Sequence, residues 1–337
     1  MRQARQKTNN QRTNDHAGLV GLIPERSCRN YFIANAPMSV SIVMAAKNAS
    51  AHVREAIESS LAQGSCVREL IVVDDGSTDD TAAVVHGLGD RRIQLLANAG
   101  SGVSAARNLG AQRATGSWLM FLDADDRLRP GAVSTLMAAA QNAPEAVLVY
   151  GDYDRIDGKG RPIGRRAFLR RRSKPSGRVL ERLVGGNFIV NGGIMIIRPD
   201  AFHAAGGFDE SLQYCEDWHC WCRLAALGEF EFIDALLLDY RVHAANTMNA
   251  ALRSPQDFFP AADKIFCDKL ILSKLPPELI PRLRRAADLH LFTYAAAQAI
   301  RFGRYREAIT YILRIAQSSP RYTPRALARL SLTCAGI

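Results

Sequence analysis

The sequence of 337 residues has no long hydrophobic run. A membrane-spanning helix needs about 20 consecutive apolar residues. The nearest approach, Leu291 to Ile300, is ten residues long and is interrupted by Thr293 and Gln298. The N-terminus is basic but lacks the apolar core of a signal peptide. We therefore expect a cytoplasmic protein, peripheral at the inner face of the membrane if it contacts one.

Cysteines are also scarce, with seven in the whole chain. An odd number at this low density argues against a disulfide scaffold and favours a reducing compartment. Cys215, Cys220 and Cys222 lie close together, but their C-x4-C-x-C spacing is not that of a zinc ribbon. We interpret this cluster as buried free thiols.

Acidic residues are fewer than basic ones, with 33 Asp+Glu against 43 Lys+Arg, so the formal net charge is +10. Such a balance suggests an anionic partner: nucleic acid, an anionic membrane surface or a phosphate-bearing substrate. No basic-aromatic stacking motif and no helix-turn-helix pattern is present, so we expect no nucleic acid. A basic nucleic-acid-binding protein remains the weaker alternative.

The chain divides into three predicted regions. Residues 1–37 show no periodicity and are rich in Asn, Gln, Arg and Thr, which predicts a disordered basic leader. Residues 38–250 alternate between strand and helix patterns. Residues 251–337 are predicted to be helical and, after residue 300, basic, with Glu307 as the single acid.

The alternation after residue 38 predicts an α/β fold, with a parallel sheet wound by helices on both faces. Buried strands are expected at 40–46, 70–73, 92–96, 118–122 and 147–150. Helices are expected at 53–61, 78–87, 101–114 and after Pro130. Further along, strands are expected at 192–198 and 230–233 and a helix at 216–227. Residues 164–180 carry seven basic residues and no acid, and are predicted to form a loop.

Acidic residues follow two of the expected strands, where ligands of such sheets bind. Asp123 and Asp125 can point at one divalent cation, Mg²⁺ or Mn²⁺, that bridges a diphosphate. Asp75 can accept hydrogen bonds from a base or ribose. Alternatively, these acids belong to helix caps or solvated turns.

Two other segments carry residue types that suit a binding or catalytic site. Gly100 and Gly102 open a helix that contains Arg107, an arrangement that suits phosphate binding, or else a flexible loop. Glu216 and Asp217 come from a distant segment, and a carboxylate there suits a general base. Alternatively, they are acids favoured by the dipole of the helix that they begin.

Seven motifs follow one another across about residues 38–248. They are Val40-Ser-Ile-Val with Lys47-Asn48, Val73-Asp-Asp-Gly-Ser-Thr-Asp79, Gly102-Val-Ser-Ala-Ala-Arg-Asn-Leu-Gly110, Phe121-Leu-Asp-Ala-Asp-Asp126, Gly206-Gly-Phe-Asp-Glu210, Glu216-Asp-Trp218 and Tyr240-Arg-Val-His243. In this order they resemble glycosyltransferase family two. The resemblance implies the GT-A fold, a mixed, mostly parallel sheet flanked by helices, here with a helical C-terminal appendage.

The resemblance also implies an activity and its partners. A sugar moves from a nucleotide-sugar donor, with a UDP-sugar favoured, to a hydroxyl of a glycan or lipid-linked acceptor, by metal-assisted displacement with inversion. The expected setting is bacterial-type synthesis of a cell-surface polysaccharide or glycolipid. The alternative is a catalytically inactive scaffold of the same family.

Individual roles follow by position in the family's motifs. Asp75 would contact the base, Asp123 the ribose, Asp125 the Mg²⁺ or Mn²⁺ ion, and Asp217 would be the catalytic base. Asn48, Lys47 and Arg107 would complete the nucleotide-sugar site, and His243 would add a metal contact or have only a structural role. Lys47 stands where the family usually has an aromatic residue, which puts the identity of the nucleotide in doubt.

The basic segments suggest further contacts. The loop from Arg165 to Lys174 would grip phosphates or simply be solvated. The basic C-terminal helices would lie against anionic lipid headgroups or only pack on the catalytic domain.

Overall fold

The computed structural model describes residues 38–163, 174–189, 192–243 and 251–334. Residues 38–337 form one compact unit. The predicted leader at 1–37 and most of the predicted basic loop, residues 164–173, lie outside the described residues. The predicted boundary at residue 250, between a catalytic domain and a helical region, stays a prediction.

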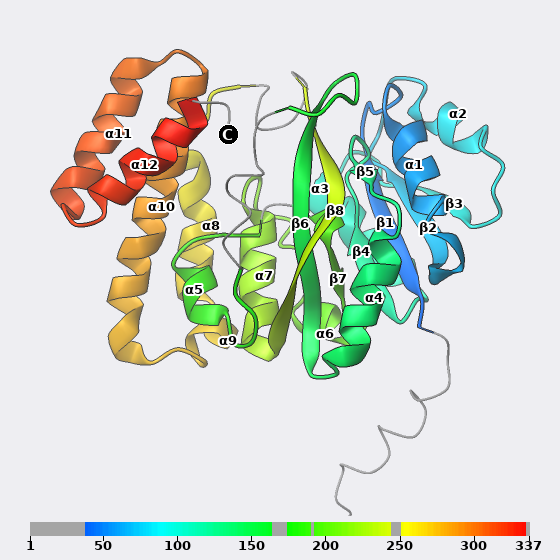
Figure 1. Cartoon of the computed structure of the whole chain (residues 1–337), viewed down its shortest axis with the longest axis horizontal. Helices are drawn as coiled ribbons and strands as arrows, with labels where there is room; N and C mark the ends of the chain where they lie inside the picture. Colours follow the sequence, from blue (N-terminus) through cyan, green and yellow to red (C-terminus); the bar gives the residue numbers. More distant parts are fainter. Residues whose placement is uncertain (1–37, 164–173, 190–191, 244–250, 335–337) are drawn as a thin grey trace, which may run out of the picture. The chain divides into compact units, whose positions relative to one another are not determined.

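The described residues form an eight-stranded sheet with the order β3-β2-β1-β4-β7-β6-β8-β5 (Figure 1). The strands are β1 Val40–Ala46, β2 Val67–Asp74, β3 Ile93–Ala97, β4 Trp118–Phe121, β5 Arg127–Leu128, β6 Ala146–Asp157, β7 Met195–Ile197 and β8 Glu229–Val242. The pairs β1–β2, β1–β4, β2–β3 and β6–β8 are parallel. The pairs of β7 with β4 and β6, and of β5 with β8, are antiparallel. The mixed, mostly parallel sheet of the GT-A fold is confirmed.

The parallel half of the sheet follows directly from its sequence. In β1 six of the seven residues are buried, and β4 is buried throughout. A strand covered by helices on both faces needs a continuous apolar run rather than an alternating one. These strands meet that condition, so they were predictable from composition alone.

Three expectations about strands are corrected. The strand predicted at 192–198 is a 3-10 turn, Gly192–Ile194, followed by the short strand β7. The turn fits because a Cβ on Gly192 would lie 2.6 Å from the Phe121 carbonyl oxygen, so only glycine allows this approach. β6 and β8 are much longer than predicted. Mostly polar residues follow Tyr150 in β6, and Asp234 interrupts the apolar pattern of β8 before its three leucines.

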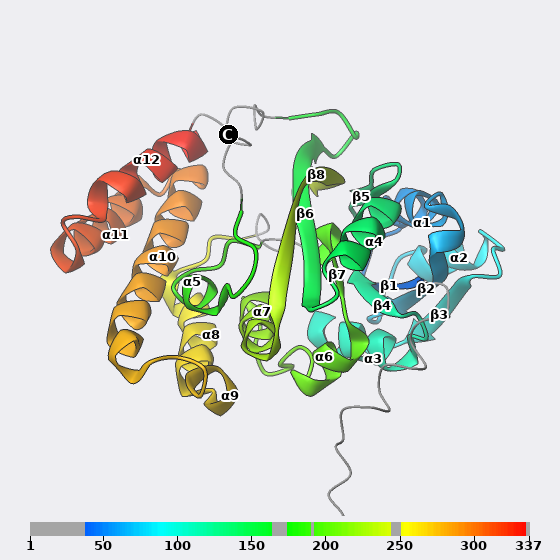
Figure 2. The ribbon, with the colours of Figure 1, turned by 60° about the horizontal axis from the view of Figure 1, so that its bottom comes forward.

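Helices lie on both faces of the sheet (Figure 2). In chain order they are α1 Val53–Leu61, α2 Thr81–His86, α3 Val103–Arg113, α4 Ala132–Asn142, α5 Leu180–Val184, α6 Pro199–Ala204, α7 Glu216–Leu227, α8 Pro255–Cys267, α9 Lys269–Leu272, α10 Ile280–Arg301, α11 Tyr305–Ser318 and α12 Thr323–Cys334. α3 contacts β1 and β2, and α4 contacts β6, β7 and β8. α5 was not expected: it begins at Leu180, the last residue of the predicted loop, and no element was predicted for residues 181–184.

The helical C-terminal part is confirmed and packs on the rest of the unit. Ser254 and Asp257 form a capping box that begins α8, with Pro255 at the first helical position. α8 contacts α7 and α10, and the Trp218 ring of α7 lies 6.0 Å from the His290 ring of α10. Among the described residues no helix has the length and apolar character needed to cross a membrane.

Cys66, Cys215, Cys220, Cys222 and Cys267 are free thiols. Cys220 and Cys222 are buried, as predicted, whereas Cys215 is partly exposed. Burial raises the pKa of the Cys220 thiol above its ordinary value, so this thiol is kept protonated.

Gly110 sets the distance between α3 and the sheet. A Cβ at this position would lie 2.3 Å from Cγ1 of the buried Val43 in β1. We therefore expect Gly110→Ala to destabilise the fold by about 1–3 kcal/mol, although alanine is the better helix former. Chemical denaturation measures this change in the free energy of unfolding.

Two variants control this experiment. Combining Gly110→Ala with Val43→Ala removes the clash and should recover part of the loss. Gly87→Ala, whose Cβ would meet its nearest atom at 3.4 Å, should change stability little. Equal effects of Gly110→Ala and Gly87→Ala would contradict the close packing.

Candidate active site

Three predicted site residues lie at one edge of the sheet. Lys47 follows β1, Asp75 follows β2 and Asp123 closely follows β4, and these are adjacent parallel strands. The carboxyl ends of adjacent parallel strands meet at the same edge, where α/β proteins bind ligands. The sheet topology therefore brings these three side chains to one side of the molecule.

Asp75 is buried and anchored at this edge. Its Oδ1 accepts hydrogen bonds from Asn98 Nδ2 at 2.7 Å and from the Gly102 backbone N–H at 3.0 Å. Its Oδ2 lies 3.5 Å from the Lys47 ammonium, which is half exposed. Asp75 thus connects β2 to the glycine turn before α3, and Lys47 reaches the same carboxylate from β1.

Asn48 holds the loops after β1 and β2 together. Its Oδ1 accepts the Thr78 backbone N–H at 2.8 Å, and its own backbone N–H donates to Ser77 Oγ at 2.9 Å. Its φ of 50° lies in the left-handed region, which asparagine tolerates better than most residues. Asn48 thus ties the turn after β2 to the end of β1.

Arg107 links two distant parts of the chain. Its guanidinium lies 2.7 Å from Asp123 Oδ1 and 3.0 Å from Glu216 Oε1. It also lies over the Phe208 ring at 5.3 Å from the centroid. Burial by itself lowers the pKa of Arg107, but Asp123 and Glu216 raise it overall, so this cation stays charged. The end of β4 and the start of α7 are thereby held together.

The segment 206–210 is fixed by Asn108, the neighbour of Arg107. Asn108 Nδ2 donates to the Phe208 carbonyl at 2.9 Å and to Glu210 at 3.0 Å, and its Oδ1 accepts the Phe208 backbone N–H at 2.9 Å. These bonds connect two motifs about 100 residues apart. They fix the path of the segment that leads into α7.

Asp217 lies in the first turn of α7, beside Glu216. Its Oδ1 accepts the Trp218 backbone N–H at 2.6 Å, and Asn187 Nδ2 donates to its Oδ2 at 3.4 Å. Burial raises the pKa of Asp217 to about 7, and the charge of Glu216 adds to the rise. A carboxylate with this pKa exchanges protons near neutral pH.

Asp125 and His243 lie in contact, with Asp125 Oδ2 2.9 Å from His243 Nε2. Burial and the Asp123 charge raise the pKa of Asp125, although the contact with His243 acts in the opposite direction. A carboxylate with an imidazole suits Mn²⁺, and one or two carboxylates with substrate phosphates suit Mg²⁺. Within the described parts of the chain, no group of three or more potential ligands has metal-binding geometry. The pair therefore fits a cation that takes its other ligands from a diphosphate.

The turn that carries these acids is tied to β8 by Arg241. This side chain is almost fully buried, at 2% exposed. Its Nε donates to the Asp125 carbonyl at 2.7 Å, and its backbone N–H donates to the Asp126 carboxylate at 2.8 Å. Its guanidinium also pairs with Glu55 of α1. Asp126 is thus a structural acceptor.

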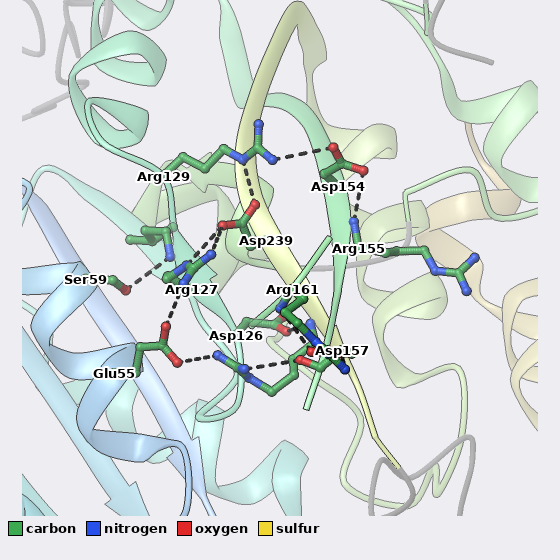
Figure 3. Close-up of polar contacts among 12 residues, drawn as sticks. Glu55, Ser59, Asp126, Arg127, Arg129, Asp154, Arg155, Asp157, Arg161 and Asp239 are labelled. Carbon is green, nitrogen blue, oxygen red and sulfur yellow. Dashed lines mark hydrogen bonds and ion pairs between the residues drawn. The ribbon is translucent and has the colours of Figure 1, made fainter. Parts of the chain in front are cut away.

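Arg127 and Arg129 extend this network (Figure 3). Arg127 lies 2.7 Å from both Glu55 and Asp239, and Arg129 lies 2.7 Å from the other oxygen of Asp239. The network joins α1, β5 and β8 immediately behind the turn after β4. It fixes the backbone from which Asp123 and Asp125 project.

Sequence reasoning did not assign roles to several residues that shape the site. Arg241 and Glu216 lie inside recognised motifs, so their positions could have been noticed, but their partners could not. Asn187 and Asn98 carry no sequence signal, since each acts through a contact with a distant aspartate.

Comparisons with known proteins find a matching family model and several similar proteins. A family model described as Glycosyl transferase family 2 matches residues 41–205. An uncharacterized glycosyltransferase of Rickettsia prowazekii is 31% identical over 225 residues, covering 65% of this chain and 69% of the relative. The succinoglycan biosynthesis protein ExoO of Rhizobium meliloti is 38% identical over 122 residues, covering 36% of this chain and 35% of the relative. Chondroitin synthase of Escherichia coli is 27% identical over 212 residues, which cover 62% of this chain and 29% of that protein.

Among solved structures, S. aureus TarS 1-349 in complex with UDP-GlcNAc superposes with a TM-score of 0.61. It is 18% identical, and the match covers 86% of this chain and 84% of TarS 1-349. At this identity the likeness shows a common fold.

We expect Arg241→Met to destabilise the protein by about 3 kcal/mol or more, because it leaves buried acceptors without their cation. Arg161→Gln is the matched control, because Arg161 pairs with Asp157 at the surface with 73% of its side chain exposed. A pair this exposed contributes little to stability. Urea denaturation measures the free energy of unfolding of both variants. Equal losses of stability would contradict the contribution assigned to the Arg241 contacts.

Proposed function

Because the chain belongs to glycosyltransferase family 2 and is therefore a transferase, we propose that it moves a sugar from a nucleoside diphosphate sugar to an acceptor hydroxyl with inversion. Its relatives include proteins of polysaccharide biosynthesis, which supports a glycan or lipid-linked acceptor in cell-surface polysaccharide or glycolipid synthesis. The likeness to TarS with UDP-GlcNAc supports a UDP-sugar as donor.

The observation that carries this proposal is the Arg107 bridge. It joins Asp123, at the sheet edge expected to bind the nucleotide, to Glu216, the neighbour of Asp217. A donor site and a base from separate segments have to meet for direct displacement, because the base must reach the acceptor opposite the leaving group. The Arg107 bridge supports this requirement, because it connects the edge of the sheet at Asp123 to the segment that contains Asp217.

The nucleotide would be held by the edge formed by β2, β1 and β4. We assign Asp75 to the base and Asp123 to the ribose, with Lys47 beside Asp75 as a further contact to base or phosphate. Asn48 keeps the loop that presents Lys47 in shape. Arg107 is a positioning residue, because both of its ionic partners are protein carboxylates.

Asp125 and His243 would hold Mg²⁺ or Mn²⁺ at the diphosphate. The ion, when bound, stabilises negative charge that develops on the phosphate oxygens as the sugar leaves. Arg241 keeps Asp125 in place through its backbone carbonyl.

Asp217 would perform the proton transfer. The acceptor hydroxyl gives its proton to the Asp217 carboxylate while its oxygen forms a bond to the anomeric carbon. The bond between that carbon and the phosphate oxygen breaks, and its electron pair leaves with the nucleoside diphosphate. Attack opposite the leaving group inverts the anomeric configuration.

The pH dependence of turnover tests the role of Asp217. Its carboxylate must be deprotonated to accept a proton, so kcat/KM should rise with pH through about 7 and level off above. Asp217→Asn should lower kcat by about a hundredfold to ten-thousandfold. Release of UDP from a panel of UDP-sugars measures both, and Glu181→Gln, an exposed acid on α5, is the matched control.

Glu216→Gln sharpens this test. Burial raises the pKa of Asp217, and the Glu216 charge raises it further. Because the variant removes that charge, the acidic limb of the kcat/KM profile should move to lower pH. A limb that stays in place would identify a different base. Since the pKa of Asp217 is raised to about 7, the protein loses stability as the pH rises from the ordinary carboxyl pKa to about 7, and the full loss is present above that. Asp217→Asn should therefore not lower the melting temperature at about pH 8.

Metal and donor binding can be measured without an acceptor. A ligand that binds only the folded state raises its melting temperature. We expect UDP with Mn²⁺ to raise it more than UDP with a chelator, and Asp125→Asn to lose that difference.

Asp200→Asn, which changes an exposed aspartate on α6, is the control and should keep the full response to Mn²⁺. A metal-dependent shift that survives Asp125→Asn would exclude Asp125 as the ligand. No shift with any nucleoside diphosphate would count against the donor site as a whole.

A further inference from the structure

Exposed large apolar side chains are concentrated in the last helices. Of the seven such side chains in the described part of the chain, five lie between Phe302 and Leu327. Single exposed apolar residues are ordinary on protein surfaces, but a concentration in one region marks an interaction surface. This region is separate in sequence from every residue assigned to the transfer reaction.

Three of these side chains form a row on α11. Tyr305, Ile309 and Leu313 are 64%, 56% and 55% exposed. Their spacing of four residues places them along one side of the helix. Ala308 and Ile315 of the same helix are buried, and α11 contacts α10 and α12. The apolar arc of α11 is therefore wider than the part that its neighbours cover. We call Tyr305, Ile309 and Leu313 the α11 row.

The stretch of chain that contains the α11 row is strongly cationic. Between residues 301 and 331 the exposed charged residues are all arginines: Arg301, Arg304, Arg306, Arg314, Arg321, Arg325 and Arg329. The one acid, Glu307, is half-buried and pairs with Arg304. An apolar row beside arginines on an amphipathic helix is the arrangement by which helices lie in the plane of an anionic membrane.

We propose that the α11 row and its arginines form a docking surface for an anionic lipid bilayer. The apolar side chains would enter the boundary between headgroups and acyl chains, and the arginines would contact the phosphates. A second copy of the chain is a poor occupant, because two such faces would bring like charges together. This surface is independent of the proposed transfer chemistry, so either can fail without the other.

Vesicle co-sedimentation of the full chain tests the proposal. Vesicles of phosphatidylcholine with anionic phosphatidylglycerol should bind the protein, and vesicles of phosphatidylcholine alone should bind it much more weakly. Binding should fall as salt is added. Ile309→Ser and Leu313→Ser should each weaken binding about tenfold or more. Arg306→Gln and Arg314→Gln should each weaken it about fivefold.

Matched controls come from other exposed positions. Leu227→Ser on α7 changes an apolar side chain, and Arg113→Gln on α3 changes a cation, and both should leave binding unchanged. Thermal unfolding of each variant separates lost docking from lost folding. If binding to anionic vesicles is absent, or is insensitive to the α11 row and to the arginines, the proposal is wrong.

A fluorescent probe gives a second measurement in a folded protein. The chain has three tryptophans, and all are buried. Tyr305→Trp should therefore report on the row, with emission shifting to shorter wavelength when anionic vesicles are added. Equal binding of soluble polyglutamate without that shift would identify an acidic protein as the partner and overturn the proposal. A dimer that Ile309→Ser converts to monomer would overturn it as well.

Discussion

One guanidinium holds the candidate site together. Arg107 lies between carboxylates that are 16 and 109 residues away in the chain, and its charge offsets a cluster that also contains Asp217. Acids gathered at one partly buried place repel one another unless a cation compensates them. Because this side chain bridges the end of β4 and the start of α7, the arrangement of the site depends on it.

A second set of contacts keeps the backbone around that bridge in place. Asn108 fixes the segment before α7, and Arg241 fixes the turn after β4 from the side of β8. Left-handed backbone at Asn48 and at Cys215, which directly precedes α7, lies in the same region. Backbone conformations of this kind persist where the surrounding structure imposes them, which is common at functional sites. The aspartates of the sheet edge thus project from loops, whereas Arg107 belongs to α3 and Asp217 to α7.

The sequence was informative where the local pattern decides the structure. β1 and α7 have the predicted bounds, because a buried parallel strand and an amphipathic helix each leave a clear periodic signal. β8 was predicted as four residues, since Asp234 interrupts its apolar pattern. Its later charged residues, Asp239 and Arg241, pair with Arg127 and Glu55 from distant segments. At the candidate site, too, contacts between distant segments leave no local pattern in the sequence. The carboxylates could be named from motifs, and so could Asp125 and His243 as partners at one metal ion. The Arg107 bridge and the Asn187 contact, in contrast, join residues far apart in sequence that no motif connects.

The central claim is that donor site and base meet across Arg107. A crystal structure of the protein with UDP and Mn²⁺ tests it most directly, because the anomalous signal of manganese locates the diphosphate without ambiguity. We predict manganese in contact with the Asp125 carboxylate and the diphosphate on the side of Arg107 that faces Asp217. Manganese and nucleotide bound elsewhere on the sheet, or an Asp217 carboxylate turned away from them, would contradict the account.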